Sequence, residues 1–217
     1  MSILFTIFKY LIFSLLLIAI SCSSNSSNKK QQESEERSVE EIYNSAMDYL
    51  NDNKYSKAHD EFIEVERLHP YSIWATRSQI MTSYVNYKLN KYADSVSGAK
   101  RYIELHPGAS DIDYAYYLIA LNHYEQINDY RRDQSFTRNA LEAFNNLIRR
   151  FPNSDYSRDA KLKLDLVNDH LAAKEMDIGR TYQNLDNYIS AINRFKTVVE
   201  VYSKTSHVPE ALARLSE

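Results

Sequence analysis

The chain has 217 residues and a formal net charge of −3 at pH 7, with acidic side chains in slight excess over basic ones. This balance argues against nucleic acid as a partner, because phosphate binding needs a concentrated positive surface. Only three glycines and four prolines occur in the whole chain, too few turn residues for a many-stranded β fold. The composition therefore predicts an all-α protein.

Residues 1–21 have the pattern of a secretory signal peptide, in which the basic residue Lys9 precedes an apolar segment that is short for a membrane span. The next residue, Cys22, is the single cysteine of the chain, so it has no partner for an intramolecular disulfide. The run Ala-Ile-Ser-Cys resembles the lipobox of bacterial lipoproteins, which implies cleavage before Cys22 and acylation of its thiol, with palmitate as one acyl group. An uncleaved anchor and a chance cysteine are the alternatives.

Residues 22–37 contain Ser, Asn, Lys, Gln and Glu but no large apolar residue after the cysteine, so they cannot bury enough surface to fold. We predict a flexible lipidated tether that lets the folded part stand on the order of 20 Å from the headgroups. Ser23 occupies the position where aspartate signals inner-membrane retention in enterobacteria. By this analogy we expect the periplasmic face of the outer membrane.

An internal repeat runs through residues 38–217. The four occurrences are Tyr55, Ala58, Phe62 and Pro70; Tyr92, Ser95, Ala99 and Pro107; Thr137, Ala140, Phe144 and Pro152; and Tyr188, Ala191, Phe195 and Ser203. The second and third positions of each set lie four apart and so share one face of a helix, where a small residue lets a neighbouring helix approach. The proline then ends the helix. The repeat predicts a series of paired helices.

In chain order we predict helices over residues 39–51, 54–68, 73–89, 92–105, 112–127, 136–150, 156–185, 188–202 and from 209 onward. Serines are expected to begin five of them, at Ser38, Ser72, Ser110, Ser154 and Ser206. Ser38 with Glu41, and Ser110 with Asp113, have the spacing of capping boxes.

This pattern resembles the tetratricopeptide repeat, a helix-turn-helix unit with alanine, phenylalanine and proline at these relative positions. The family's small residue in the first helix is represented by Ala46 and Ser83. The resemblance implies that residues 38–217 form a right-handed α-solenoid of about five helical hairpins, the last incomplete.

Two irregularities narrow the resemblance. A polar loop over residues 128–134 separates one pair of helices, and the helix that begins near Tyr156 is about thirty residues long. In this setting the chain resembles the BamD family of outer-membrane assembly lipoproteins. The segments that carry this resemblance are Arg132-Asp133-Gln134, Phe151-Pro152-Asn153-Ser154-Asp155-Tyr156, Leu171-Ala172, Glu175, Tyr182, Tyr188 and Asn193-Arg194.

The resemblance implies a non-enzymatic scaffold of the β-barrel assembly machinery. Members of the family bind the POTRA domains of a BamA-like barrel protein through their C-terminal repeats, assemble with other lipoproteins, and contact the C-terminal strands of unfolded outer-membrane proteins. By resemblance, the partner-binding residues are Arg194, Tyr182, Tyr188, Arg132 and Asp133.

Each of these residues also has a simpler interpretation. Arg194 fits a solvated surface charge, and Arg131, Arg132 and Asp133 fit a local ion pair in a charged loop. The repeat tyrosines, which include Tyr55, Tyr92 and Tyr114, fit ordinary packing between helices. No catalytic motif occurs and no histidines have ligand spacing, so we expect no enzyme activity, cofactor or metal.

Two other functions stay open from the sequence. One is a different periplasmic tetratricopeptide adaptor lipoprotein, for cell division or pilus assembly, whose repeats should be regular. The other is a soluble envelope enzyme with a helical domain, which would need a catalytic constellation.

Overall fold

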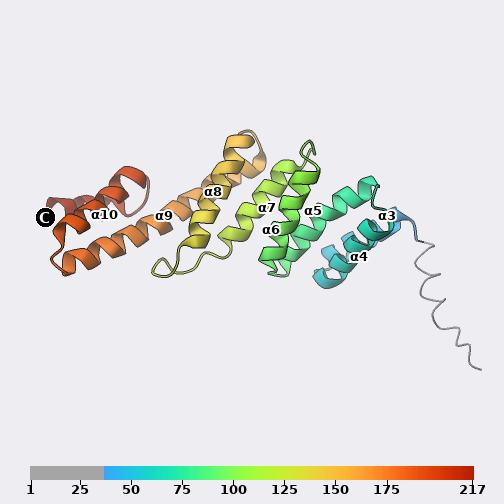
Figure 1. Ribbon diagram of the computed structural model, residues 1–217, viewed down its shortest axis with the longest axis horizontal. Coiled ribbons are helices and arrows are strands. Elements are labelled where there is room, and N and C mark those ends of the chain that lie inside the picture. The colour runs from blue at the N-terminus through green and yellow to red at the C-terminus, as the bar shows by residue number, and fades with distance from the viewer. Residues whose placement is uncertain (1–36) are drawn as a thin grey trace, which may run out of the picture. The chain divides into compact units, whose positions relative to one another are not determined.

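The computed structural model describes residues 37–217 (Figure 1). The predicted signal peptide, the acylated Cys22 and almost all of the tether lie outside this part and stay predictions. The chain divides into two compact units, Met1–Glu41 and Ile42–Glu217. In the described part of the first unit, the Ser38 backbone N–H donates to Glu41 Oε2 at 2.8 Å and the Glu41 N–H donates to Ser38 Oγ at 3.3 Å. The predicted capping box is therefore confirmed.

Residues 37–217 form α-helices joined by short turns, with no strand in this part of the chain. The helices are α3 (Val39–Asn51), α4 (Tyr55–Leu68), α5 (Ile73–Lys88), α6 (Tyr92–Leu105), α7 (Ile112–Tyr124), α8 (Ser135–Arg150), α9 (Asp155–Asn184), α10 (Tyr188–Val201) and α11 (Val208–Ser216). Every predicted helix is present. The largest difference is at the end of α7, where Gln126 N–H and Ile127 N–H donate to carbonyls three residues back, which tightens the chain into turns.

Within the unit Ile42–Glu217, each helix packs against the helices that precede and follow it in sequence (Figure 1). In addition α7 contacts both α5 and α9, so alternate helices also touch. This is the contact pattern of a helical solenoid, in which each hairpin meets only its neighbours. The predicted fold class, an all-α solenoid of about five helical hairpins with the last one incomplete, is confirmed: residues 37–217 form four hairpins followed by the single helix α11.

The repeat positions form the core between the helices. Both members of the small-large pair are buried in every occurrence: Ala58 and Phe62, Ser95 and Ala99, Ala140 and Phe144, Ala191 and Phe195. The three prolines of the repeat each lie two residues beyond a helix end, in exposed turns. The four-residue spacing therefore predicted the buried face correctly, because it is set by the helix period alone.

Three of the four turns inside the hairpins have the same local structure, a left-handed Asn or Asp followed two residues later by a tyrosine. Asn53, Asn90 and Asp186 have φ angles of 58°, 59° and 56°, in the left-handed region that asparagine and aspartate tolerate better than most residues. Two residues later in each turn, a repeat tyrosine donates its hydroxyl to that side-chain oxygen. These bonds are Tyr55 to Asn53 at 2.6 Å, Tyr92 to Asn90 at 3.0 Å and Tyr188 to Asp186 at 2.9 Å.

Two of the predicted helix-start serines are wrong. Ser72 and Ser154 cap α5 and α9 with their side chains, but α7 begins after Asp111 and α11 after His207. Long-range contacts replace the expected caps. Asp113 accepts the Ser154 hydroxyl at 2.6 Å, and the Ser206 hydroxyl donates to Asp169 of α9 at 2.7 Å.

Candidate partner-binding surfaces

Arg194 lies on α10 and faces the long helix α9. Its Nη1 is 2.9 Å from Glu175 Oε2, and the arginine side chain stays 42% exposed while that of Glu175 is 19% exposed. An ion pair of this exposure is worth about 1 kcal/mol or less. Arg194 therefore helps to join α10 to α9 and still presents part of its guanidinium to the surface.

The two predicted partner-binding tyrosines differ in accessibility. Tyr182 is half-buried against the apolar cluster that includes Met176 and Phe195, so packing accounts for most of its ring. Tyr188 is 58% exposed, with its hydroxyl on Asp186. This hydrogen bond to a carboxylate raises the pKa of Tyr188, and its ring remains open to a partner.

Three exposed apolar residues near Tyr188 were missed from the sequence. Leu185 is 69% exposed, Ile189 77% and Ile192 40%. We call Leu185, Tyr188, Ile189 and Ile192 the α9–α10 apolar surface. The sequence could have predicted this surface. The repeat places Ala191 and Phe195 on the buried face of the helix, so the apolar residues at positions 189 and 192 lie outside that face. Clustered exposed apolar residues commonly mark protein-binding sites.

The second candidate surface is the α7–α8 loop, residues 125–134. Its organiser is Gln134, a buried residue whose Nε2 donates to the carbonyls of Asp129 at 3.3 Å, Tyr130 at 3.1 Å and Arg132 at 3.1 Å. Thr137 Oγ1 donates to Gln134 Oε1 at 2.9 Å and orients the amide. One side chain thus satisfies three loop carbonyls and holds the loop in one shape.

The loop is also attached to α9. His170 Nε2 lies 2.5 Å from the Asn128 carbonyl and Lys174 Nζ donates to the Arg131 carbonyl at 3.1 Å. The Tyr130 ring meets the His170 ring edge-on with centroids 6.3 Å apart. The polar loop is therefore fixed against a helix some forty residues downstream.

Arg132 and Asp133, both exposed, have different local roles. Asp133 Oδ2 accepts the Ser135 backbone N–H at 3.1 Å at the start of α8. Hydrogen bonds from Ser135, with a smaller contribution from Arg138, lower the pKa of Asp133. Within residues 37–217 the Arg132 guanidinium has no ion-pair partner, so the Arg132–Asp133 pair suggested by the sequence does not form.

Both candidate surfaces involve the long helix α9. Lys174 contacts the loop and the next residue, Glu175, pairs with Arg194. Tyr182 lies about two helical turns further, roughly 10 Å along the axis. The structure therefore places the predicted residues along one edge of α9 and its neighbours, in two groups and not in one pocket.

A third feature is an open groove of about 450 Å³ between α6, α7 and α8. Ile103, Tyr116 and Ile119 form its apolar lining, and charged residues such as Lys100 and Glu142 also line it. His123 lies in the same groove with Nδ1 buried and without a hydrogen-bond partner. Burial, reinforced by the positive charge of Lys100, lowers the pKa of His123.

Within the described part of the chain, no group of three or more His, Cys, Asp or Glu side chains could hold a metal ion. No helix among residues 37–217 is both long and apolar enough to cross a bilayer.

Stacked helical hairpins with exposed charged and apolar surfaces define the class, a tetratricopeptide-like helical-repeat protein. The family is equally clear. The model of the YfiO family, described as outer membrane lipoprotein, matches residues 35–217, and the chain belongs to this family.

The chain is similar to three proteins that are each named outer membrane protein assembly factor BamD. It is 49% identical over 183 residues to that of Caulobacter vibrioides, covering 84% of this chain and 60% of the relative. For Rickettsia prowazekii the identity is 43% over 176 residues, covering 81% and 70%. For Neisseria gonorrhoeae it is 33% over 192 residues, covering 84% and 72%. The chain thus spans 60% of the Caulobacter relative's length. These names describe assembly factors, in agreement with a non-enzymatic protein.

Proposed function

We propose that this protein is a lipid-anchored, non-enzymatic scaffold of the β-barrel assembly machinery on the periplasmic face of the outer membrane. The observation that carries the proposal is the match to the outer membrane lipoprotein family over residues 35–217, together with relatives named assembly factor BamD. A solenoid suits this role because its helices expose long surfaces to other polypeptides. Residues 1–21 serve as signal peptide, Cys22 carries the lipid and residues 22–37 form the tether.

One partner is a BamA-like barrel protein, bound through its POTRA domains at the C-terminal repeats. The α9–α10 apolar surface supports this part of the proposal, because it is exposed on the most C-terminal hairpin. Exposed apolar groups surrounded by charged residues are the arrangement expected of a protein interface. Ile189 and Tyr188 supply apolar contact area, and Arg194, on another side of α10, offers a separate charged contact.

A second class of partner is the C-terminal strand of an unfolded outer-membrane protein. A row of tyrosines supports it: the Tyr84 and Tyr114 rings are 6.4 Å apart and the Tyr114 and Tyr156 rings 5.2 Å apart, which links α5, α7 and α9. All three rings are partly exposed. Aromatic side chains with a polar end suit an extended strand, which offers apolar side chains and backbone groups together. Other assembly lipoproteins complete the expected set of partners.

The test is detergent extraction of the full-length protein from its own membranes, followed by identification of the chains that co-purify. We expect a POTRA-bearing barrel protein. Ile189→Asp should reduce its recovery because a charge then occupies the apolar surface, and the residue is so exposed that the fold tolerates the change. Lys161→Asp, at an exposed position of α9 far from that surface, is the control. Reproducible absence of any barrel protein would favour a different periplasmic adaptor.

A further inference from the structure

The α7–α8 loop contains two aspartates and two arginines, and the structure uses the two kinds of charge differently. Asp129 Oδ1 accepts the Arg131 backbone N–H at 2.8 Å, and Asp133 Oδ2 accepts the Ser135 N–H at 3.1 Å. Both carboxylates are thus engaged by backbone donors of their own segment. The two aspartates and two arginines therefore do not form ion pairs with one another, although their sequence proximity suggests it.

Among residues 37–217, neither arginine of the loop forms an ion pair with a side chain. Arg131 lies over the ring of its neighbour Tyr130, 5.4 Å from the centroid. Neither Arg131 nor Arg132 has a carboxylate within ion-pair distance among residues 37–217, and both are exposed. Elsewhere on the chain some arginines do pair with acids, as Arg180 does with Glu210 and Arg194 with Glu175. The exposed guanidinium groups of the loop are therefore open to a carboxylate of another molecule.

Two more cations lie beside them. Lys174 of α9 donates to the Arg131 carbonyl at 3.1 Å, and Arg138 of α8 is close enough to Asp133 to affect its pKa. In the described part of the chain neither has a carboxylate within ion-pair distance. We call Arg131, Arg132, Arg138 and Lys174 the loop basic cluster.

The backbone that carries the cluster is held in place before any partner arrives. Gln134 binds three of its carbonyls, and His170 and Lys174 attach it to α9. A surface loop with these internal contacts loses little conformational entropy when it binds, which favours affinity. Unpaired guanidinium groups on a fixed backbone are thus a ready-made recognition surface.

We propose that the loop basic cluster binds carboxylates on an acidic surface of a partner protein. The planar guanidinium matches a carboxylate in a two-bond fork, and arginine and tyrosine together are typical of the energetic centres of protein interfaces. An anionic lipid surface fits less well, since Asp129 and Asp133 flank the two arginines and would meet the same negative field. A protein can place its carboxylates opposite the arginines and away from the aspartates.

This inference rests on the proposed scaffold function and adds the chemistry of one docking surface. To test it, Tyr130 is replaced by the photo-crosslinker benzoylphenylalanine in the full-length, membrane-anchored protein, and the adduct is mapped by mass spectrometry. The same replacement is made in an R131E/R132E background. The matched control is K91E/K161E, which reverses two exposed lysines outside the loop. Thermal unfolding of each variant checks that the fold is intact.

The expected adduct is a protein, crosslinked through a peptide that contains Asp or Glu. R131E/R132E should lower its yield about tenfold or more, as expected for loss of close interfacial charge pairs, and K91E/K161E should leave it unchanged. Converting the mapped carboxylates to lysine should restore the adduct in the R131E/R132E background. R131K/R132K should retain only part of the yield, because lysine keeps the charge and loses the fork.

Three results would overturn the inference: a phospholipid adduct, a protein adduct that R131E/R132E does not reduce, or no adduct while a crosslinker at position 189 captures a partner. The proposed function fails separately. If the charge swap succeeds but no barrel assembly protein is recovered at any position, the acidic docking surface stands and the assembly role does not.

Discussion

At the residue scale, three hairpin turns are built from an Asn or Asp in the left-handed region and a tyrosine two positions later. The same turns contain a backbone bond across five residues, such as Lys91 N–H to the Asn86 carbonyl at 2.9 Å. This is the bonding of a helix C-terminus closed by a left-handed residue, a position that glycine usually occupies. The side-chain oxygen gives Asn and Asp an advantage here, because it anchors the tyrosine that begins the next helix.

Substitutions at Asn90 test this turn. Asn90→Ala should lower the free energy of unfolding by about 1–2 kcal/mol, because an alanine Cβ is strained at positive φ. Asn90→Gly relieves the strain and loses only the exposed bond to Tyr92, so we expect a loss of less than about 1 kcal/mol. Tyr92→Phe isolates that bond. Urea unfolding checks the order of the variants, and equal stability of the alanine and glycine variants would show that the backbone angle does not matter.

Gly179 is a second position with a special requirement, because the packing of α9 against α10 leaves no room there for a Cβ atom. A Cβ there would lie 2.5 Å from Cε1 of Phe195, a ring that is buried between α9 and α10. The residue stands sixteen positions before Phe195, as Ala46 does before Phe62 and Ser83 before Ala99. It is therefore the small residue of the first helix in the fourth hairpin, which sequence comparison of the repeats could have identified.

We expect Gly179→Ala to destabilise the protein by about 1–2 kcal/mol. Overpacking costs about 1–3 kcal/mol, and the better helix propensity of alanine returns up to about 1 kcal/mol. Gly108→Ala is the control, because a Cβ at that exposed turn meets nothing within 4 Å. Phe195→Leu should partly rescue Gly179→Ala in chemical unfolding. An unchanged midpoint for Gly179→Ala would mean that the ring moves without cost.

At the element scale, features set by residues close together in sequence were predicted correctly, and contacts between residues far apart in sequence were not. The pairing of Ala58 with Phe62 depends on the helix period alone, and it was predicted correctly. Ser110 was not the cap of α7, since Asp113 binds a serine 41 residues away. The attachment of the α7–α8 loop to His170 needs α9 to pack beside it, and the Arg194–Glu175 pair needs the α9–α10 hairpin. Residue spacing within a helix therefore could not predict the contacts between different helices.

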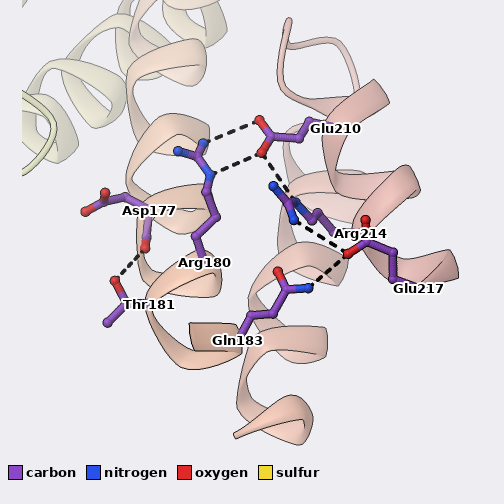
Figure 2. A network of polar contacts seen from close by, with 7 residues as sticks. All are labelled: Asp177, Arg180, Thr181, Gln183, Glu210, Arg214 and Glu217. Carbon is purple, nitrogen blue, oxygen red and sulfur yellow. Dashed lines mark hydrogen bonds and ion pairs between the residues drawn. The ribbon is translucent and has the colours of Figure 1, made fainter. Parts of the chain in front are cut away.

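The last helix, α11, is joined to α9 by the charged contacts drawn in Figure 2. Arg180 faces Glu210 with Nε–Oε1 and Nη2–Oε2 distances of 3.2 and 3.4 Å, and Gln183 Nε2 donates to Glu217 at 3.0 Å. The Arg180 and Glu210 side chains are 37% and 41% exposed, so their pair is worth about 1 kcal/mol or less. Ala211, fully buried in the cluster with Ala172 and Met176, provides the apolar contact.

These magnitudes predict which contact keeps α11 in place. Arg180→Gln should leave α11 docked, with amide hydrogen exchange faster by less than about tenfold. Ala211→Asp should remove exchange protection from α11, because an unpaired carboxylate cannot stay buried there. Protection in α4 and α5 should be unchanged in both variants. Loss of α11 protection in Arg180→Gln alone would assign the docking to the ion pair instead.

At the scale of the whole molecule, charged groups make stability depend on pH in two windows. Hydrogen bonds from Lys163 and Tyr117 outweigh partial burial and lower the pKa of Asp159, and bonds from Ser206 do the same for Asp169. Each carboxylate stabilises the fold above its unfolded value near 3.8, and this contribution is lost as pH falls through the lower folded pKa. His123 affects stability at a higher pH than these carboxylates do, because the ordinary pKa of histidine is near 6.5. Burial lowers the pKa of His123 in the folded protein.

For His123 the unfolded chain takes up a proton at a pH where the folded protein does not. Stability should therefore begin to fall as pH drops below about 6.5, and the fall should stop once the folded histidine is protonated. His123→Gln should flatten the urea midpoint between about pH 7 and 5 and leave the carboxylate window at lower pH. Lys100→Gln should weaken the dependence in part, since its charge opposes that of the imidazolium. A histidine variant with an unchanged slope would assign the dependence to other groups.

The predicted lipid is also a property of the whole molecule, because it determines where the solenoid works. One buried methylene contributes about 0.8 kcal/mol, and two or more acyl chains hold a protein on a membrane stably. We expect the mature wild-type protein to begin at Cys22, to incorporate labelled palmitate and to resist carbonate extraction. Cys22→Ser should lose the label and retain the leader, while Ser24→Ala in the tether should behave as wild type. Intact mass measurement decides the matter: an unmodified Cys22, or a wild-type chain that keeps residues 1–21, would contradict the lipoprotein assignment.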